Sequence, residues 1–292
     1  MWWNRIYALL GGGRFEADTR IDGRWICGLR PPITLRCGFR VLLDLRDWSQ
    51  RRAYFGGDYY QTSLVGLLEH LLRPGDNWVD VGANIGLVTL IAASHIGRTG
   101  HGLAFEPNPL VFPRLAEHVA INGLSSIHCY EAALGADSGR RTLAFPKRHT
   151  GAGTLLSAIA SDCSYVEVDV RRGDDLLSGL AKRPTIIKID VEGFEPFVVE
   201  GLARALTNPE TAVIIEVVES FLRRAGSSPE ALMNCMQAQG YHAYSFESVP
   251  MRWRRRLAIH PITTLPSGCN CDVLFINCRS DILMSRVAPL IV

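Results

Sequence analysis

Acidic side chains follow directly on two apolar runs of the sequence, where they could hold a ligand or move a proton. Asp80 stands near the end of one run, two residues before Gly82, and Asp190 and Glu192 follow another run. A carboxylate beside a glycine turn would repel a pyrophosphate by about 4 kcal/mol at contact distance and an effective dielectric of about 20. The acid near the glycine turn therefore favours a cationic ligand.

A further acid, Glu106, lies twenty residues after Gly86, at the end of the next predicted strand. A carboxylate at this position accepts hydrogen bonds from the two hydroxyls of a ribose. S-adenosylmethionine carries an ammonium and a sulfonium, which suit the acid at the glycine turn, and a ribose diol, which suits Glu106. We therefore predict it as the ligand. The glycines alone would also fit an NAD-dependent dehydrogenase, but their spacing is G-x-x-x-G and not G-x-G-x-x-G. An alternative role for Asp80 is to cap the glycine turn.

The acids after the fourth predicted strand are candidates for proton transfer. This strand is expected beside the first, at the switch point where open parallel sheets bind ligands. Methyl transfer to a hydroxyl requires alignment of the reacting atoms and removal of one proton. Because partial burial raises the pKa of a carboxyl group, Asp190 and Glu192 are base candidates, and His149 is a third. Lys188 is expected to pair with one of the acids.

Two other interpretations of these acids stay open. Asp190 and Glu192 could have a structural role, either as a helix cap or as a partner of the donor's ammonium. Glu216 and Glu219, at and after the end of the fifth strand, could form an oxygen-rich magnesium site with Asp190. We assign no metal ligands.

The elements that would position these residues alternate between strands and helices, which predicts parallel βαβ winding. Strands are predicted at 77–81, 101–106, 126–131, 185–190, 212–216, 242–246 and 271–277, and helices at 61–72, 87–95, from Asn108 to Asn122, from Glu195, and at 228–240. Residues 1–72, with short strands at 25–27 and 40–45, break the pattern. Residues 140–180 also break it and are predicted to be irregular, apart from a half-buried strand at 165–171.

Three motifs resemble those of the FkbM family of methyltransferases: DVGANIG at 80–86, FEPNP at 105–109 and IKIDVEGFE at 187–195. The likeness extends to 54–59, 150–155 and 270–276, and it covers about residues 50–278. It implies a Rossmann-like class I methyltransferase, with a doubly wound, mostly parallel sheet and an antiparallel last strand. It also implies O-methylation of a hydroxyl on a sugar, a glycoconjugate or a polyketide-type natural product. The sequence departs from the pattern at Tyr60, where many members carry an acid.

The resemblance also implies the residues that bind the donor: Asp80, Gly82, Ala83, Asn84, Gly86, Glu106, Asn108, Glu131 and Ala132. The first five would line the methionine end of S-adenosylmethionine. Glu106 would bind the ribose, and Asn108 would lie beside the adenosine. Glu131 and Ala132 would flank the adenine by main-chain contact.

Three segments make up the predicted organisation. Residues 1–72 form an N-terminal β/α segment that could cover the acceptor, residues 73–279 form the Rossmann-like core with an insertion at 140–180, and residues 280–292 form a tail. The boundary signal is the run RPGD at 73–76.

Composition limits the class of protein. The 31 Lys and Arg residues against 29 Asp and Glu residues leave a net charge of +2, which is not typical of a nucleic-acid surface. No window approaches the roughly 20 apolar residues of a membrane-spanning helix. Eight cysteines without a C-x-x-C pair indicate reduced thiols and a cytoplasmic location. Trp2 and Trp3 could give peripheral membrane contact.

A basic run with one aromatic residue, at 252–256, keeps an RNA-modifying methyltransferase open as an alternative. Against it, the turn N/D-P-P-Y/F, typical of methylation at a base amino group, is absent from the sequence. A donor-binding protein without catalysis is a further alternative. The predicted acceptor is a small molecule or a glycan with a free hydroxyl.

Overall fold

The computed structural model describes residues 31–146, 153–156, 162–180, 182–250 and 255–292. His149, Trp2 and Trp3, the predicted strand at 25–27 and residues 252–254 of the basic run lie outside this part of the chain. The chain divides into a smaller compact unit that ends at Tyr60 and a larger one from Gln61 to Val292. The boundary expected at residues 72–73 therefore lies inside the larger unit.

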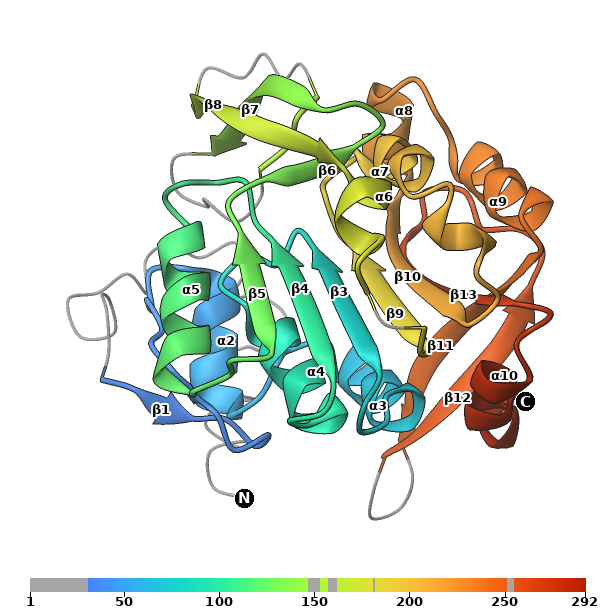
Figure 1. Cartoon of the computed structure of the whole chain (residues 1–292), viewed down its shortest axis with the longest axis horizontal. Helices are drawn as coiled ribbons and strands as arrows, with labels where there is room; N and C mark the ends of the chain where they lie inside the picture. The colour runs from blue at the N-terminus through green and yellow to red at the C-terminus, as the bar shows by residue number, and fades with distance from the viewer. Residues whose placement is uncertain (1–30, 147–152, 157–161, 181, 251–254) are drawn as a thin grey trace. The chain divides into compact units, whose positions relative to one another are not determined.

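The larger unit is built on an eight-stranded sheet of order β12-β11-β13-β10-β9-β3-β4-β5 (Figure 1). Its strands are β3 (Asn77–Val81), β4 (His101–Phe105), β5 (Ile127–Tyr130), β9 (Thr185–Ile189), β10 (Thr211–Val218), β11 (Tyr241–Pro250), β12 (Arg255–Ile262) and β13 (Asn270–Asn277). Strands β5, β4, β3, β9 and β10 run parallel, whereas β13 pairs antiparallel with both β10 and β11. This order confirms the Rossmann-like, doubly wound sheet with an antiparallel last strand. The sequence analysis missed β12.

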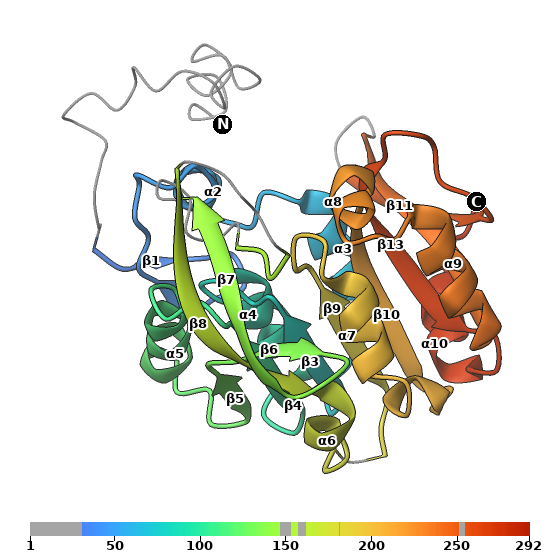
Figure 2. The same cartoon turned by 90° about the horizontal axis from the view of Figure 1, so that it is seen from above.

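Helices cover both faces of this sheet, with α3 and α4 on one face and α7 and α9 on the other (Figure 2). The helices are α3 (Thr62–Leu71), α4 (Leu87–Ile96), α5 (Phe112–Ile121), α6 (Gly173–Leu177), α7 (Glu195–Gly201), α8 (Glu219–Arg224), α9 (Pro229–Ala238) and α10 (Asp281–Val287). Because both faces are covered, every residue of β3 and β9 is buried, including the polar residues Asn77, Asp80, Thr185 and Lys188. None of the helices in the described residues is both long and apolar enough to cross a membrane.

The start of α5 differs from the prediction. The helix begins at Phe112, whereas the sequence predicts a cap at Asn108. The Asn108 side chain instead accepts a hydrogen bond from the Leu110 N–H at 3.0 Å, which forms a local turn before the helix. The predicted end is confirmed, since Gly123 follows the helix with a left-handed φ of 64°.

A second, three-stranded sheet lies beyond the carboxyl ends of β3, β4 and β5 (Figure 1). It consists of β6 (Ala133–Gly135), β7 (Gly139–Pro146) and β8 (Cys163–Arg172), in the order β6-β8-β7. Strand β8 confirms the predicted strand at 165–171. The prediction of an irregular segment is wrong for β7, because Leu143 and Phe145 pack there with Val168 in a small core of their own.

The smaller unit contains β1 (Ile33–Thr34), β2 (Arg40–Val41) and α2 (Trp48–Gly56) among its described residues. Of the strand predicted at 40–45, Arg40 and Val41 pair with β1 as strand β2. The Asp47 side chain caps α2 by accepting from the Ser49 N–H at 2.8 Å.

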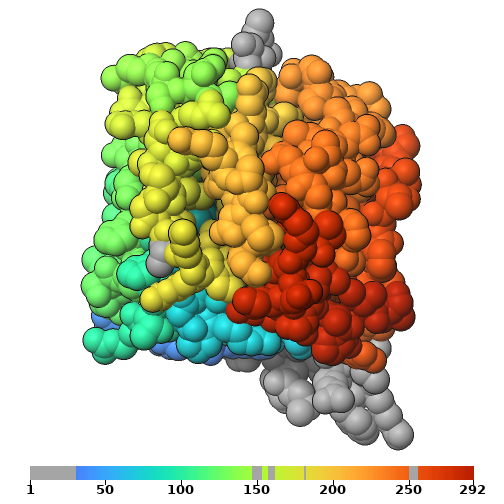
Figure 3. Space-filling model, turned by 45° about the vertical axis from the view of Figure 1, so that its right-hand side comes forward, coloured from blue at the N-terminus to red at the C-terminus, as the bar shows by residue number. Residues whose placement is uncertain are grey.

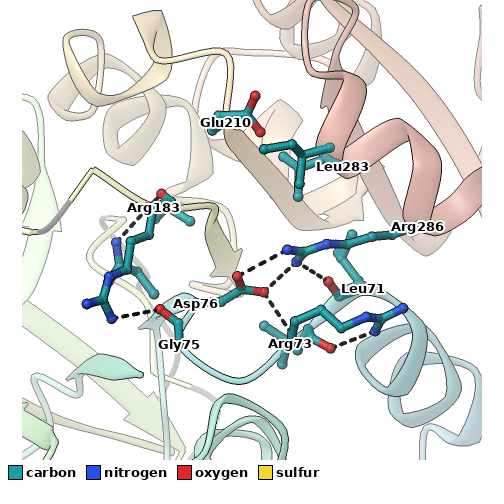
Figure 4. A network of polar contacts seen from close by, with 12 residues as sticks. Leu71, Arg73, Gly75, Asp76, Arg183, Glu210, Leu283 and Arg286 are labelled. Atoms are coloured by element: carbon teal, nitrogen blue, oxygen red, sulfur yellow. Dashed lines mark hydrogen bonds and ion pairs between the residues drawn. The ribbon is translucent and has the colours of Figure 1, made fainter. Parts of the chain in front are cut away.

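The last residues of the chain belong to the larger unit and do not form a tail. Helix α10 is followed by a 3₁₀ turn, η3 (Ala288–Leu290). Arg286 of α10 forms an ion pair with Asp76 and donates to the Leu71 carbonyl at 2.7 Å (Figure 4). In the space-filling view, the C-terminal residues in red lie against the cyan residues around the start of β3 (Figure 3).

Candidate active site

The glycine turn after β3 and the loop after β9 meet at one point. Gly82 has a φ of 82°, and a Cβ atom built on it would lie 1.9 Å from the carbonyl oxygen of Asp190. The Asp190 N–H in turn donates to the Val81 carbonyl at 3.0 Å. Since only glycine permits both this φ and this approach, Gly82 brings the predicted donor turn against the predicted base.

Asp80 is completely buried beneath this turn. Its Oδ2 accepts a hydrogen bond of 2.5 Å from the Thr89 hydroxyl of α4, whereas its Oδ1 has no hydrogen-bond partner among the described residues. The Trp78 indole N–H lies close enough to lower the pKa of Asp80 without completing a hydrogen bond. Burial raises this pKa overall, and the Lys188 ammonium opposes the effect. The bond to Thr89 links Asp80 to the first turn of α4.

Glu106, directly after β4, connects the loop that follows β3 with the loop that follows β4. Its Oε2 accepts from the Asn84 N–H at 2.9 Å, and its Oε1 accepts from the Asn108 N–H at 2.8 Å. Asn84 adopts a left-handed φ of 51°, which aims its N–H at this carboxylate. Burial raises the pKa of Glu106 to about 7. Each carboxylate oxygen has a second lone pair that a ribose hydroxyl can use.

The adenine side of the predicted site is made of loops at neighbouring strand ends. Asn108 is buried next to Glu106, and Ala132, just after β5, is also buried. The side chain of Glu131 is exposed, which agrees with the expectation of main-chain contact at that residue. The rings of Phe105 and Tyr130 stack with centroids 5.0 Å apart and hold the ends of β4 and β5 together.

Helix α5 supports the glycine turn from behind, which the sequence analysis missed. The buried His118 ring makes a 2.7 Å hydrogen bond, through Nδ1, to the Ile85 carbonyl. A Cβ atom at Gly86 would lie 2.6 Å from Leu115 Cδ1. The sequence signal for this support was a histidine three residues after a core leucine on one helix face.

A group of charged side chains gathers where β9, β10 and β13 end or begin. The Lys188 Nζ lies 2.8 Å from Asp190 Oδ2, which confirms the expected pairing of this lysine with an acid. Glu216 follows Ile215, which pairs with Ile189 in the register of β10 and β9, so Glu216 and Asp190 come next to each other at the ends of these strands. Asp272, in β13, lies opposite Glu216 in β10. We call Lys188, Asp190, Glu216 and Asp272 the acid cluster.

Protonation within the acid cluster differs from the prediction. Burial opposes ionisation of Asp190, but Lys188 outweighs it and holds the pKa of Asp190 below its usual value. The expectation of a raised pKa is therefore wrong for Asp190. The charge of Asp190, together with burial, raises the pKa of Glu216 to about 10, and burial raises that of Asp272 to about 6. Asp272 was not predicted from the sequence.

The turn that carries Glu192 is held in a strained shape. Glu192 has a left-handed φ of 55°, uncommon for a residue with a side chain, and its carbonyl accepts from the Thr154 hydroxyl at 2.9 Å. Glu195 Oε1 accepts from the N–H groups of Val191 at 3.2 Å and Gly193 at 3.0 Å. Strain held by surrounding bonds is typical of functional positions. The role of Glu195 was missed because its partners are main-chain groups.

Glu219 lies apart from the acid cluster. It pairs with Arg223 and accepts from the Gly268 N–H, so it is not available to the magnesium site considered with Asp190 and Glu216. Within the described part of the chain, no three His, Cys, Asp or Glu side chains are arranged as metal ligands.

Comparison with known proteins adds a family and named relatives. The family model described as "Methyltransferase FkbM domain" matches residues 80–243. The chain is 28% identical to Methyltransferase 1 of Beauveria bassiana, over 50% of this chain and 67% of that protein. It is 31% identical to the hexuronic acid methyltransferase AglP of Haloferax volcanii, over 54% and 62%.

A crystal structure of methyltransferase FkbM from Methylobacillus flagellatus aligns with 16% identity and a TM-score of 0.43, over 72% of this chain and 50% of that one. The chain thus matches between half and two thirds of the length of these three proteins.

The residues at the glycine turn fit S-adenosylmethionine. The unpartnered Oδ1 of Asp80 can accept from an ammonium, and Gly82 leaves no side chain between the turn and a ligand. Glu106 has lone pairs for the ribose diol. S-adenosylmethionine is cationic at its methionine end, and a cation stabilises a buried carboxylate such as that of Asp80.

Proposed function

The chain belongs to the FkbM methyltransferase domain family and uses S-adenosylmethionine, and on that premise we propose that it methylates a hydroxyl of a sugar, a glycoconjugate or a polyketide-type natural product. A sugar-type acceptor is supported by the relative named as a hexuronic acid methyltransferase. The observation that carries the proposal is the meeting of the donor turn at Gly82 with the acid-rich loop at Asp190.

The donor supplies an electrophilic methyl group on a good leaving group. Asp80 would hold its methionine end and Glu106 its ribose, and the glycine turn would let the main chain approach it. The acceptor hydroxyl is a poor nucleophile, so it must be aligned with the methyl group and lose its proton as the new bond forms. We assign selection of the acceptor to the three-stranded sheet, which lies beyond the carboxyl ends of β3, β4 and β5 (Figure 1).

Glu192 is the first candidate for the base that takes this proton. Asp190 is engaged by Lys188 at 2.8 Å, and its lowered pKa makes it a weak base. Glu192 follows it on the strained turn, two residues beyond the contact with Gly82. In this assignment Asp190 is the residue that fixes the loop and Glu192 the one that accepts the proton. His149 is the alternative base.

The test is mass spectrometry of acceptor candidates incubated with the purified protein and S-adenosylmethionine. The panel contains neutral glycosides, uronic acids, polyketide alcohols and RNA, and the product is detected as the gain of one methylene mass. Methylation of an oxygen in a glycoside or a polyketide would support the proposal. Methylation of RNA alone, or of nitrogen alone, would refute it and favour the RNA-modifying alternative.

A further inference from the structure

One peptide unit in the turn after β9, the one that joins Glu192 to Gly193, is held at both of its polar groups. Its carbonyl, on Glu192, accepts a hydrogen bond of 2.9 Å from the Thr154 hydroxyl. Its N–H, on Gly193, donates to Glu195 Oε1 at 3.0 Å. Because a peptide unit is planar and its two polar groups point in opposite directions, these bonds together oppose its rotation. They therefore fix the backbone at Glu192.

Thr154 is attached through its main chain to β7 of the three-stranded sheet. Its N–H donates to the Ala144 carbonyl at 2.8 Å, and its carbonyl accepts from the Ala144 N–H at 2.9 Å. A Cβ atom built on Gly153 would lie 3.2 Å from Leu143 Cδ1, so the chain here also packs on the small core of that sheet. The main chain of Thr154 thus belongs to the three-stranded sheet, while its side chain bonds to the turn after β9.

The contact between Thr154 and the turn is buried. Thr154 is only 8% exposed, and its hydroxyl also accepts from the Leu156 N–H at 3.2 Å. Leu156 covers the turn, since a Cβ atom at Gly193 would lie 2.8 Å from Leu156 Cδ1. The same Cβ atom would lie 3.0 Å from the Phe221 carbonyl oxygen of α8. The turn is therefore enclosed by the residues after Thr154 on one side and by α8 on another.

We propose that Thr154 is a positioning residue for methyl transfer, whose hydroxyl holds the peptide after Glu192 so that the Glu192 side chain faces the acceptor. The proposal rests on the proposed function, in which Glu192 is the first candidate for the base. Thr154 acts through Glu192 and exchanges no proton with the acceptor. Because one residue joins the base turn to the sheet assigned to acceptor selection, an acceptor held by that sheet meets the base at a fixed position.

Two substitutions separate the hydroxyl from the rest of the Thr154 side chain. Thr154→Val has nearly the shape of threonine but no donor, whereas Thr154→Ser keeps the hydroxyl and loses a methyl group. Neither removes the main-chain bonds to Ala144. Thr207→Val is the matched control, because the exposed Thr207 also donates through its hydroxyl to a main-chain carbonyl, that of Arg204, at 2.7 Å.

The hold on the turn is measured by amide hydrogen exchange, followed by NMR on the whole protein without an acceptor. In Thr154→Val we expect the Gly193 amide to exchange on the order of tenfold faster, because its peptide unit is released at the carbonyl. The Ala144 amide should keep its native rate. Thr154→Ser and Thr207→Val should leave the Gly193 rate within about threefold of the native one. An unchanged Gly193 rate in Thr154→Val, or equal acceleration at Gly193 and Ala144, would overturn the proposal.

Steady-state kinetics test the positioning role. Thr154→Val should lower kcat on the order of tenfold, because the base is no longer held in place. The KM for the acceptor and the calorimetric affinity for S-adenosylmethionine should stay within about twofold of the native values, since the hydroxyl is bonded to Glu192 and Leu156 and not to a substrate. Thr154→Ser should keep kcat within about threefold of the native value. Equal kcat in the two variants, or a raised KM with native kcat in Thr154→Val, would contradict the role.

The exchange measurement requires no acceptor, so it separates this inference from the proposed function. If the Gly193 amide responds to Thr154→Val but the native protein methylates none of the acceptors, the proposed function and the positioning role both fail, while the hold on the turn stands. If the native protein methylates a hydroxyl but Thr154→Val changes neither the Gly193 amide nor kcat, the proposed function stands and the inference fails.

Discussion

Asp80 and Lys188 lie directly opposite each other in the neighbouring parallel strands β3 and β9. Both are buried, and each favours the charged form of the other: Lys188 opposes the burial effect on Asp80, and Asp80 helps to raise the pKa of Lys188. Lys188 also pairs with Asp190. One buried cation thus balances the donor turn on one side and the acid cluster on the other.

Replacing Lys188 with methionine should therefore damage both halves of the site. Asp80 and Asp190 would be left without their cation in a buried environment, which costs about 3–5 kcal/mol of unfolding free energy when one partner of a buried pair is removed. Urea denaturation measures the change. Lys182→Met, an exposed position, is the control and should stay within about 0.5 kcal/mol of the native protein. Equal stability of the two variants would contradict the shared role of Lys188.

Gly82→Ala should abolish binding of S-adenosylmethionine. The new Cβ would lie 1.9 Å from the Asp190 carbonyl oxygen, so the two loops would have to separate. Gly57→Ala is the matched control, because Gly57, directly after α2, also has a left-handed backbone with a φ of 68°, but no atom within 4 Å of the new Cβ. It should lose only about 1 kcal/mol of stability and bind the donor normally. Calorimetry reports both affinities, and normal binding by Gly82→Ala would show that the close approach is not required.

Donor affinity should rise with pH through neutrality because of Glu106. Burial raises its pKa from 4.5 to about 7, and the ribose hydroxyls donate to the ionised form. Affinity should therefore increase between about pH 6 and pH 8, and Glu106→Gln should lose both the affinity and its pH dependence. Glu195, whose pKa is also about 7, has main-chain partners only, so Glu195→Gln should retain the pH dependence. Calorimetric titrations at several pH values distinguish these outcomes.

The same two acids make the protein without donor less stable as the pH rises. A carboxyl group whose pKa is higher in the folded than in the unfolded state binds more protons when folded. Its contribution is fully present below about pH 4.5 and is lost as the pH rises through about 7. Glu106→Gln and Glu195→Gln should each flatten the decline of unfolding free energy over this range. A decline that stays unchanged in both variants would show that other groups cause it.

Glu192→Gln should lower turnover by roughly a hundredfold or more while donor affinity stays nearly unchanged. The amide keeps the size of the side chain but cannot accept a proton from the acceptor hydroxyl. Asp190→Asn removes the partner of Lys188, so it should lower donor affinity and stability as well as turnover. Full turnover in Glu192→Gln would remove this residue as the base and leave His149.

The amino-acid sequence by itself determined the parallel strands of the central sheet and the turn that follows the first of them. Short, mostly apolar runs beside glycine or proline signals are enough to locate β3 and β9, because strands buried on both faces are mostly apolar, although Asp80 and Lys188 interrupt them. The acids Asp80 and Glu106 could be assigned to the donor because each stands at a strand end beside a turn. These are local patterns, and local patterns are visible in one sequence.

Only the tertiary structure decided the pKa values of the charged groups in the site. Lys188, Glu216 and Asp272 come from three strands, and their pKa values depend on distances across the sheet that no spacing along the chain contains. Asp190, predicted to have a raised pKa, has a lowered one: the sequence indicated that Lys188 pairs with one of the acids, but only the 2.8 Å contact in the folded chain shows that its ammonium outweighs burial at Asp190. Electrostatic interaction depends on separation in space, so the protonation of this site follows from the fold.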